Sequence, residues 1–126
     1  MGIMAALTGN AAEITPEKGQ ELFAQVLGPD EHVLRAYELF RDAFVFTEQR
    51  LILKDVQGIT GKKIGWHSVP YRAISHFAIE TAGTNDWDAE LKIYVSGNPE
   101  PAISKKFNKK LNIYEVGSVL SERALA

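Results

Sequence analysis

Hydrophobic and polar residues alternate in short runs through the middle of the chain. In the segment LKIYVS, Leu91, Ile93 and Val95 alternate with Lys92 and Tyr94, as in a strand that has one face in water. Segments rich in turn-forming residues, such as TEQR, QGITGKK and AGTNDWD, separate these runs. The pattern predicts seven strands, at residues 32–40, 43–47, 50–56, 62–70, 73–81, 90–96 and 102–107.

A helix is predicted on each side of these strands. The segment ITPEKGQELFAQVLGPDE has Thr15 as an N-cap, Pro16 at the first helical position and Gly28 before Pro29 as a stop signal. In the segment LNIYEVGSVLSERAL, Asn112 can cap a second helix. An amphipathic C-terminal helix is expected there, with an apolar face formed by Ile113, Val116, Leu120 and Ala124.

Composition restricts the class of protein. The 126 residues are 45% hydrophobic and 24% charged, which is typical of one globular domain. We expect residues 15–126 to form that domain and residues 1–14 to form a loosely ordered arm. The chain has no cysteine, so disulfides, thiolate metal ligands and cysteine nucleophiles are excluded.

The charge and the hydropathy argue against two classes of partner. The formal net charge is -2 and the pI is near 5.9, so the chain has no general attraction to nucleic acid or to anionic membranes. No apolar run approaches the length of a bilayer span. We therefore expect neither nucleic-acid binding nor integral membrane association. The absence of cysteine favours a cytoplasmic protein.

The order of the elements predicts the fold class. Seven short strands followed by one amphipathic helix indicate a small, strongly bent antiparallel sheet or a partly open barrel. The C-terminal helix is expected to cover an opening of that barrel.

Several motifs resemble those of the bacterial pleckstrin-homology family. They are DVQGITGKKIGWHSVPYRAISHFAIETAG and the later segment DAELKIYVSG, within a resemblance that runs from Thr15 to Leu125. The resemblance implies a mainly β, PH-like, partly open barrel of two roughly orthogonal antiparallel sheets with a C-terminal helix. It also implies a ring-forming homo-oligomer, and it carries over no catalytic residue and no cofactor. The chain is therefore not expected to be an enzyme, although fold resemblance alone does not assign a function.

A serine, two histidines and two aspartates suggest a hydrolytic triad, formed from Ser68, His67 or His76, and Asp86 or Asp88. Neighbouring residues of a strand point to opposite faces, so His67 cannot readily act on Ser68. No Gly-x-Ser-x-Gly elbow or glycine-rich oxyanion turn is present. We therefore predict no catalytic residues.

The same two histidines raise the question of a metal site. A hairpin that turns at Tyr71 and Arg72 is predicted to place His67 opposite His76. A stable zinc or copper site needs a third or fourth ligand, and the remaining histidine, His32, lies in the first strand without a suitable spacing. The expectation is a structural hairpin shaped by Pro70 and Tyr71, without a bound metal.

A cluster of lysines is the candidate ligand site. A patch for phosphate groups or other anions, with an affinity that falls as the salt concentration rises, would be formed by Lys62, Lys63, Lys105, Lys106, Lys109 and Lys110. In eukaryotic lipid-binding pleckstrin-homology domains, basic residues near the loop between the first two strands hold the inositol phosphates. Here that loop is the short LFRDAF, with Arg41 next to Asp42, which argues against phosphoinositide binding.

The first strand is apolar on both of its expected faces. Val33, Tyr37 and Leu39 fall on one face, and Leu34, Ala36 and Phe40 fall on the other. One face is therefore expected to be covered by the helices or by another copy of the chain, and the interface candidates are Val33, Leu34, Leu39, Phe40, Val45 and Trp87.

Two functional hypotheses follow. The first is a non-catalytic module that assembles with itself, as a ring, and that also binds another protein. The alternative is a module that uses its lysines to bind a small ligand or an anionic membrane surface.

Overall fold

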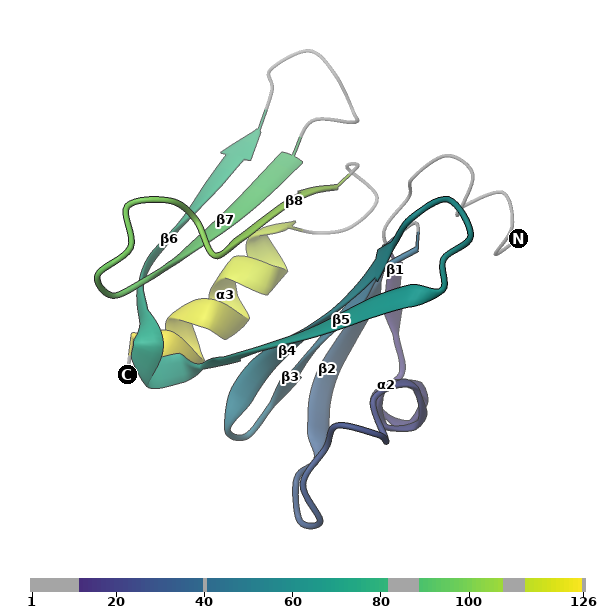
Figure 1. Ribbon diagram of the computed structural model, residues 1–126. Coiled ribbons are helices and arrows are strands. Elements are labelled where there is room, and N and C mark those ends of the chain that lie inside the picture. Colours follow the sequence, from purple (N-terminus) through teal and green to yellow (C-terminus); the bar gives the residue numbers. More distant parts are fainter. Residues whose placement is uncertain (1–11, 40, 82–88, 108–112, 126) are drawn as a thin grey trace. The chain divides into compact units, whose positions relative to one another are not determined.

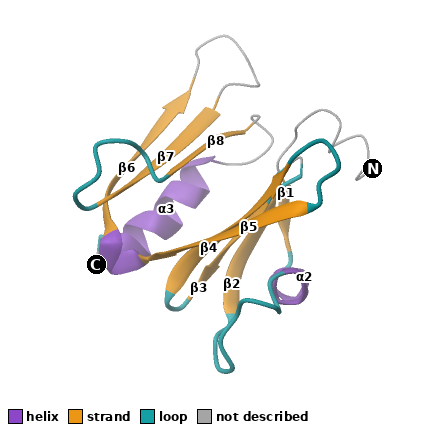
Figure 2. Cartoon of the chain, viewed as in Figure 1, coloured by secondary structure: helices purple, strands orange, loops and turns teal. Residues whose placement is uncertain are grey.

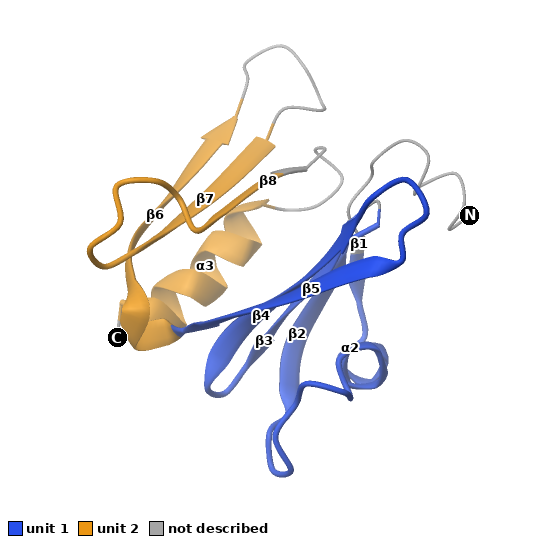
Figure 3. Ribbon diagram, in the orientation of Figure 1, with its two compact units in different colours: residues 1–70 blue, residues 71–126 orange. Residues whose placement is uncertain are grey.

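The computed structural model describes residues 12–39, 41–81, 89–107 and 113–125. The chain divides into two compact units, Met1–Pro70 and Tyr71–Ala126 (Figure 3). Within the described residues, each unit has one antiparallel sheet and one α-helix (Figure 2).

The first unit is built on a five-stranded sheet (Figure 1). Its strands follow one another in chain order, and each pairs with the next in the antiparallel sense. They are β1 (Ala12–Ile14), β2 (Val33–Glu38), β3 (Ala43–Thr47), β4 (Arg50–Gln57) and β5 (Lys63–Pro70). Helix α2 (Pro16–Leu22) connects β1 to β2.

Helix α2 begins as the sequence predicts. The Oγ1 atom of Thr15 accepts a hydrogen bond from the Lys18 amide at 3.1 Å, which satisfies one of the free amides of the first turn. The helix ends at Leu22, several residues before the predicted stop at Gly28. Gly19 allows a close approach to β2, because a Cβ atom at this position would lie 2.6 Å from the Cβ of Ala36.

The five-stranded sheet is apolar on both faces, and α2 packs on one of them. The core on that face consists of Phe23, Val33, Ala36, Ala43, Val45 and Ile52. The other face also holds buried residues, among them Tyr37, Phe44, Phe46, Leu51 and Leu53. Tyr37 stacks on Phe44, with ring centroids 4.9 Å apart.

The predicted division of β2 into two faces is wrong at Val33. Val33 pairs with Thr47, whereas Arg35 pairs with Phe46, so β2 carries one extra residue between them. Such a β-bulge reverses the alternation of side chains along a strand. Val33 therefore lies on the same face as Ala36, toward Gly19 of α2, and not with Tyr37.

The second unit contains a three-stranded antiparallel sheet in chain order. A short 3-10 turn, η1 (Tyr71–Ala73), leads into β6 (Ile74–Thr81), which pairs with β7 (Ala89–Val95), and β7 pairs with β8 (Ile103–Phe107). The C-terminal helix is α3 (Ile113–Ala124). Its buried residues are Ile113, Val116, Gly117 and Leu120, which confirms the predicted apolar face.

Helix α3 lies close to β6. A Cβ atom on Gly117 would stand 2.5 Å from the Cδ1 atom of Ile79, so glycine lets the helix backbone approach the strand. Within this unit, the packing of α3 therefore depends on a small residue, as does the packing of α2 in the other unit.

The mainly β fold and all seven predicted strands are confirmed, with ends that agree within two residues. An eighth strand, β1, occupies the last residues of the segment expected to be an arm. The described strands form two separate sheets and do not close into a barrel.

The predicted hairpin between residues 62–70 and 73–81 is wrong. β5 pairs with β4, and β6 pairs with β7, so the two segments belong to different sheets. The physical reason is the turn at Tyr71–Ala73, which is helical and does not reverse the chain into the same sheet.

Candidate functional site

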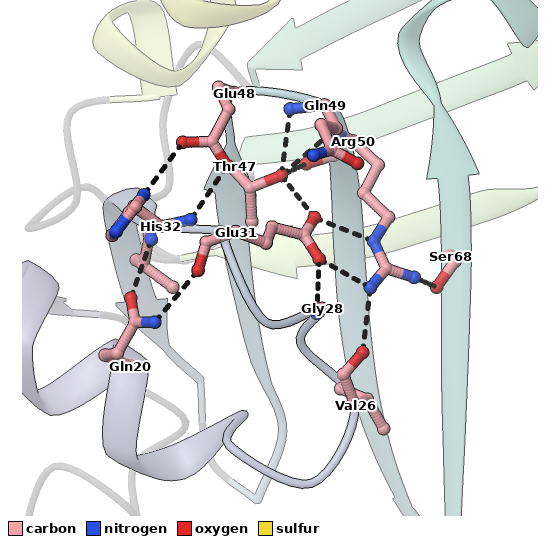
Figure 4. A network of polar contacts seen from close by, with 11 residues as sticks. Gln20, Val26, Gly28, Glu31, His32, Thr47, Glu48, Gln49, Arg50 and Ser68 are labelled. Atoms are coloured by element: carbon pink, nitrogen blue, oxygen red, sulfur yellow. Dashed lines mark hydrogen bonds and ion pairs between the residues drawn. The ribbon is translucent and has the colours of Figure 1, made fainter.

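A buried ion pair connects the loop before β2 to the start of β4. Glu31 is only 3% exposed. The Nε and Nη2 atoms of Arg50 lie 2.9 and 2.7 Å from its two carboxylate oxygens (Figure 4). The Thr47 hydroxyl and the Gly28 amide also donate to this carboxylate, at 2.7 and 3.0 Å. Charge-assisted bonds of this kind are the strong ones in proteins.

The network extends from the ion pair to three further segments. Arg50 donates from Nη2 to the Val26 carbonyl at 2.8 Å and from Nη1 to the Ser68 hydroxyl at 2.7 Å (Figure 4). The Gln20 side chain of α2 donates to the Glu31 carbonyl at 3.0 Å and accepts from the Val33 amide at 2.8 Å. The network therefore fastens α2 and its following loop to β4 and β5.

The electrostatics of the pair favour the charged state of both groups. The hydrogen bond from Arg50, together with the smaller effects of the bonds from Gly28 and Thr47, lowers the pKa of Glu31 to about 2, against the opposing effect of burial. The hydrogen bond to Glu31 in turn raises the pKa of Arg50. A carboxylate that is ionised and fully bonded is a poor general base, so the network is a structural clamp.

Ser68 belongs to this clamp and not to a triad. Its hydroxyl accepts a hydrogen bond from the guanidinium of Arg50, a group that cannot remove a proton from it. His67 is exposed and pairs in register with Leu53 of β4, and its side chain makes no hydrogen bond to a described residue. Asp86 and Asp88 lie outside the described residues.

A serine and a histidine that the sequence analysis did not pair lie together on β6. The Ser75 hydroxyl is 3.0 Å from Nδ1 of His76 and donates to the Tyr94 carbonyl at 3.3 Å. The His76 ring stacks on Tyr94, with centroids 4.2 Å apart. Among the described residues, no carboxylate hydrogen-bonds the His76 ring, so the third group that orients the base of a catalytic triad is absent from this contact. The contact arises at an irregularity between Ile74 and His76, which no sequence signal indicates.

The histidines do not form the predicted cross-strand pair. His67 lies in the five-stranded sheet, whereas His76 lies in the three-stranded sheet and pairs with Tyr94. Nδ1 of His32 is 3.5 Å from a carboxylate oxygen of Glu48. Among the described residues, no group of three His, Asp or Glu side chains could hold a metal ion.

The lysine patch divides between the two units. Lys62 and Lys63 are exposed at the beginning of β5, in the first unit. Lys105 and Lys106 belong to β8, in the second unit. Lys109 and Lys110 lie outside the described residues. In the first unit, the nearby Lys54 places its ammonium group 5.6 Å from the Trp66 ring centroid.

The interface candidates also differ from one another in exposure. Val33 and Val45 are buried, at 6% and 0% exposed, so they are core residues of the first unit. Leu34 and Leu39 are half-buried and remain accessible to a partner. Phe40 and Trp87 lie outside the described residues.

The outer edge of β5 is an edge of the five-stranded sheet. β5 pairs with β4 on one side, and it has no strand on its other side among the described residues. From Ile64 to Val69 it carries no formally charged residue when its histidine is neutral. Proteins commonly protect such edges with charges, prolines or bulges. Here Lys63 and Pro70 stand only at the two ends.

None of the described helices has the length and apolar character needed to cross a bilayer.

Comparison with known proteins gives consistent results. The family model for the bacterial PH domain matches residues 2–124. The chain is 49% identical over 121 residues to the uncharacterized protein YjqA of Bacillus subtilis, covering 96% of this chain and 97% of that protein.

Two solved structures have the same fold. One is a duf1696 family protein with a pleckstrin-homology domain from Shewanella loihica, 44% identical with a TM-score of 0.79, covering 92% of this chain and 98% of that one. The other is a pleckstrin homology domain from Shewanella amazonensis, 45% identical with a TM-score of 0.79 and 98% coverage of each chain. Because the family model and these relatives cover nearly the whole chain, this protein belongs to the bacterial PH domain family.

Proposed function

We propose that this protein is a non-catalytic assembly module of the cytoplasm, which associates with copies of itself into a closed ring and offers that ring to another protein. The observation that carries the proposal is the open edge of β5, whose central residues have neither a neighbouring strand in the described chain nor a formal charge. Such an edge is a template for pairing with another chain.

The chemistry of the polar groups supports a role in binding over a role in catalysis. The buried carboxylate of Glu31 is held by Arg50, and the Ser68 hydroxyl is held by the same guanidinium. The Ser75 hydroxyl donates to a backbone carbonyl. Each of these polar groups is therefore bonded to another part of the protein and is not presented to a substrate.

The two edges of the five-stranded sheet differ from each other, and this difference favours a ring over a twofold dimer. The open edge of the five-stranded sheet belongs to β5, and its opposite edge is the short strand β1 with the start of β2. A contact between these different edges of two copies is heterologous. Heterologous contacts repeat from copy to copy and close into rings when the rotation permits.

Size-exclusion chromatography coupled to light scattering tests the proposal. The expected mass is a fixed multiple of the 14.0 kDa protomer mass at micromolar concentration. A protomer mass over the whole concentration range would contradict it.

The edge itself is tested by adding charge to it. We expect the double variant Ile64→Lys, His67→Lys to lower the mass while keeping a cooperative melt, because both side chains are exposed and charges block edge pairing. The matched control is Ser118→Lys, Ser121→Lys, which adds two lysines to the exposed surface of α3 and is expected to keep the wild-type mass.

A further inference from the structure

The loop between β4 and β5 holds an isoleucine entirely in solvent. Ile59 is 102% exposed, and Ile64, just after the loop, is 42% exposed. We call residues 58–62 the Ile59 loop. Single exposed apolar residues are common on protein surfaces. The exposure of Ile59 indicates a binding role only in combination with the defined backbone conformation of the loop.

The Ile59 loop has a defined backbone conformation. Gly58 and Gly61 both have positive φ, of 80° and 69°, which side-chain-bearing residues rarely adopt. The Arg41 guanidinium donates to the Gly58 carbonyl from the neighbouring β2–β3 connection. The isoleucine is therefore presented by a braced turn, directly before the exposed Lys62 and Lys63.

The same unit carries a groove of about 610 Å³ beside α2. We call it the α2 groove, and it is lined by Pro16, Glu17, Gln20, Glu21, Ala24, His32 and Val33. Its floor is apolar, because Val33 is only 6% exposed there and Pro16 and Ala24 flank it. A volume of this size is within the usual range for binding pockets, and it exceeds that of one aliphatic side chain.

The rim of the α2 groove is acidic. Glu17 and Glu21 are exposed, lie one helical turn apart, and make no ion pair with a described residue. The nearby Lys18 contributes little positive charge to this rim, since its ammonium lies 3.9 Å from a carboxylate oxygen of Glu38. His32 is next to Glu48. The groove therefore fits an apolar side chain with cationic neighbours.

The Ile59 loop offers an apolar side chain with cationic neighbours. Lys62 and Lys63 follow the apolar tip and, like the two glutamates, make no ion pair with a described residue. The local acids are engaged elsewhere: Asp42 accepts from the Val56 amide, and Asp55 accepts from the Gln57 side chain. The two surfaces are complementary in both apolar character and charge sign, which steers association and fixes register.

We propose that Ile59 of one copy inserts into the α2 groove of the next, with Lys62 and Lys63 facing Glu17 and Glu21. The proposal rests on the self-assembly proposed above and names its contact. The Ile59 loop adjoins β5, and the α2 groove adjoins β1 and β2, so the two surfaces belong to opposite edges of one sheet. Each copy therefore offers one of each surface, as a ring requires.

The test uses two variants that each remove one surface. The loop variant is Ile59→Ser, Lys62→Ser, Lys63→Ser, and the groove variant is Glu17→Gln, Glu21→Gln, Ala24→Arg. All these side chains are exposed, so both variants are expected to keep a cooperative melt. The single variant Ile59→Ser serves if either triple variant fails to fold.

Light scattering of each variant alone is expected to give the protomer mass. An equimolar mixture of the two is expected to give twice the 14.0 kDa protomer mass and nothing larger, because one intact loop and one intact groove remain. A symmetric contact would not produce this complementation.

Three results would overturn the inference. If the wild-type protein is a protomer, the proposed assembly and this contact both fail. If the wild-type protein is an oligomer and both variants keep its mass, the assembly stands and the contact lies elsewhere. If the loop variant keeps the wild-type mass but loses binding to vesicles of phosphatidylglycerol and phosphatidylcholine, the loop docks on lipid.

Discussion

Arg50 donates a hydrogen bond to each carboxylate oxygen of Glu31, from Nε to Oε2 at 2.9 Å and from Nη2 to Oε1 at 2.7 Å. Because Glu31 is buried, removing the arginine would leave a charge without a partner in a poorly solvated site. The ion pair therefore couples the loop before β2 to β4 more tightly than an exposed pair could.

The first prediction concerns the pH dependence of stability. The pKa of Glu31 is about 2 in the folded protein, below its usual value of 4.5. Its contribution is therefore fully present above pH 4.5 and is lost as the pH falls toward 2. The contribution is about 3 kcal/mol, since each pKa unit is worth about 1.4 kcal/mol. Urea unfolding from pH 7 to pH 2 measures it.

The control for this prediction is Glu31→Gln, which cannot titrate. We expect it to be less stable than the wild type at pH 7 and to show a smaller loss of stability below pH 4.5. Parallel pH profiles for the two proteins would show that Glu31 does not have the lowered pKa.

A second prediction separates the two close-packed glycines. Gly19→Ala is expected to cost about 2 kcal/mol, because the new methyl group would meet the Cβ of Ala36 at 2.6 Å and that atom is fixed to β2. Gly117→Ala is expected to cost less, because the clash there is with the movable Cδ1 of Ile79. Equal losses in chemical denaturation would contradict this order.

The β-bulge in β2 gives a third prediction. Val33→Lys is expected to unfold the first unit, because this side chain is in the core. Leu34→Lys is expected to remain folded, because Leu34 is only half-buried. Circular dichroism melts of the two proteins measure the difference. A folded Val33→Lys protein with a wild-type melt would show that Val33 is not a core residue.

A fourth prediction concerns hydrolytic activity. Ser68→Ala and His76→Ala are expected to fold normally and to abolish no esterase or phosphatase turnover. The Ser68 hydroxyl is bonded to the Arg50 guanidinium, and no described carboxylate hydrogen-bonds His76 beside Ser75. A screen with chromogenic esters and phosphate esters checks this. Turnover that disappears in both variants would refute it.

The fifth prediction concerns α3. Truncation before Ile113 is expected to cause aggregation, because three apolar side chains of the helix, Ile113, Val116 and Leu120, are buried. Their burial is worth roughly 5 kcal/mol at about 1.5–3 kcal/mol per side chain. Sedimentation and thermal melts of the truncated chain measure the effect. A soluble truncated protein with a wild-type melting temperature would count against it.

The fold could be predicted where local signals are strong. Alternating residues and turn segments located the strands, and Thr15 with Pro16 located the start of α2, because these signals act within a few residues. The sequence did not predict that β5 pairs with β4 and not with β6, because this pairing depends on the helical turn at Tyr71–Ala73. The bulge that places Val33 beside Ala36 is likewise set by packing against α2.

The candidate sites were harder to predict because they depend on contacts between distant residues. Glu31 and Arg50 are 19 residues apart, and no spacing rule connects a loop acid to a strand arginine. Ser75 and His76 were not paired because neighbours on a regular strand point apart. Ile59 did carry a signal, since an isoleucine between glycines in a turn has little chance of burial, but the segment was interpreted only as a polar loop.

The order of strands in the two sheets has a consequence for biosynthesis. In both sheets every strand pairs with the one that follows it in the chain. Apart from β1 and β2, which α2 separates, the paired strands are joined by short connections, so the contact order within each sheet is low. Proteins with short-range contacts fold faster than those with distant pairings. The five-stranded sheet is complete at Pro70, so a nascent chain can form it while the ribosome is still adding the rest.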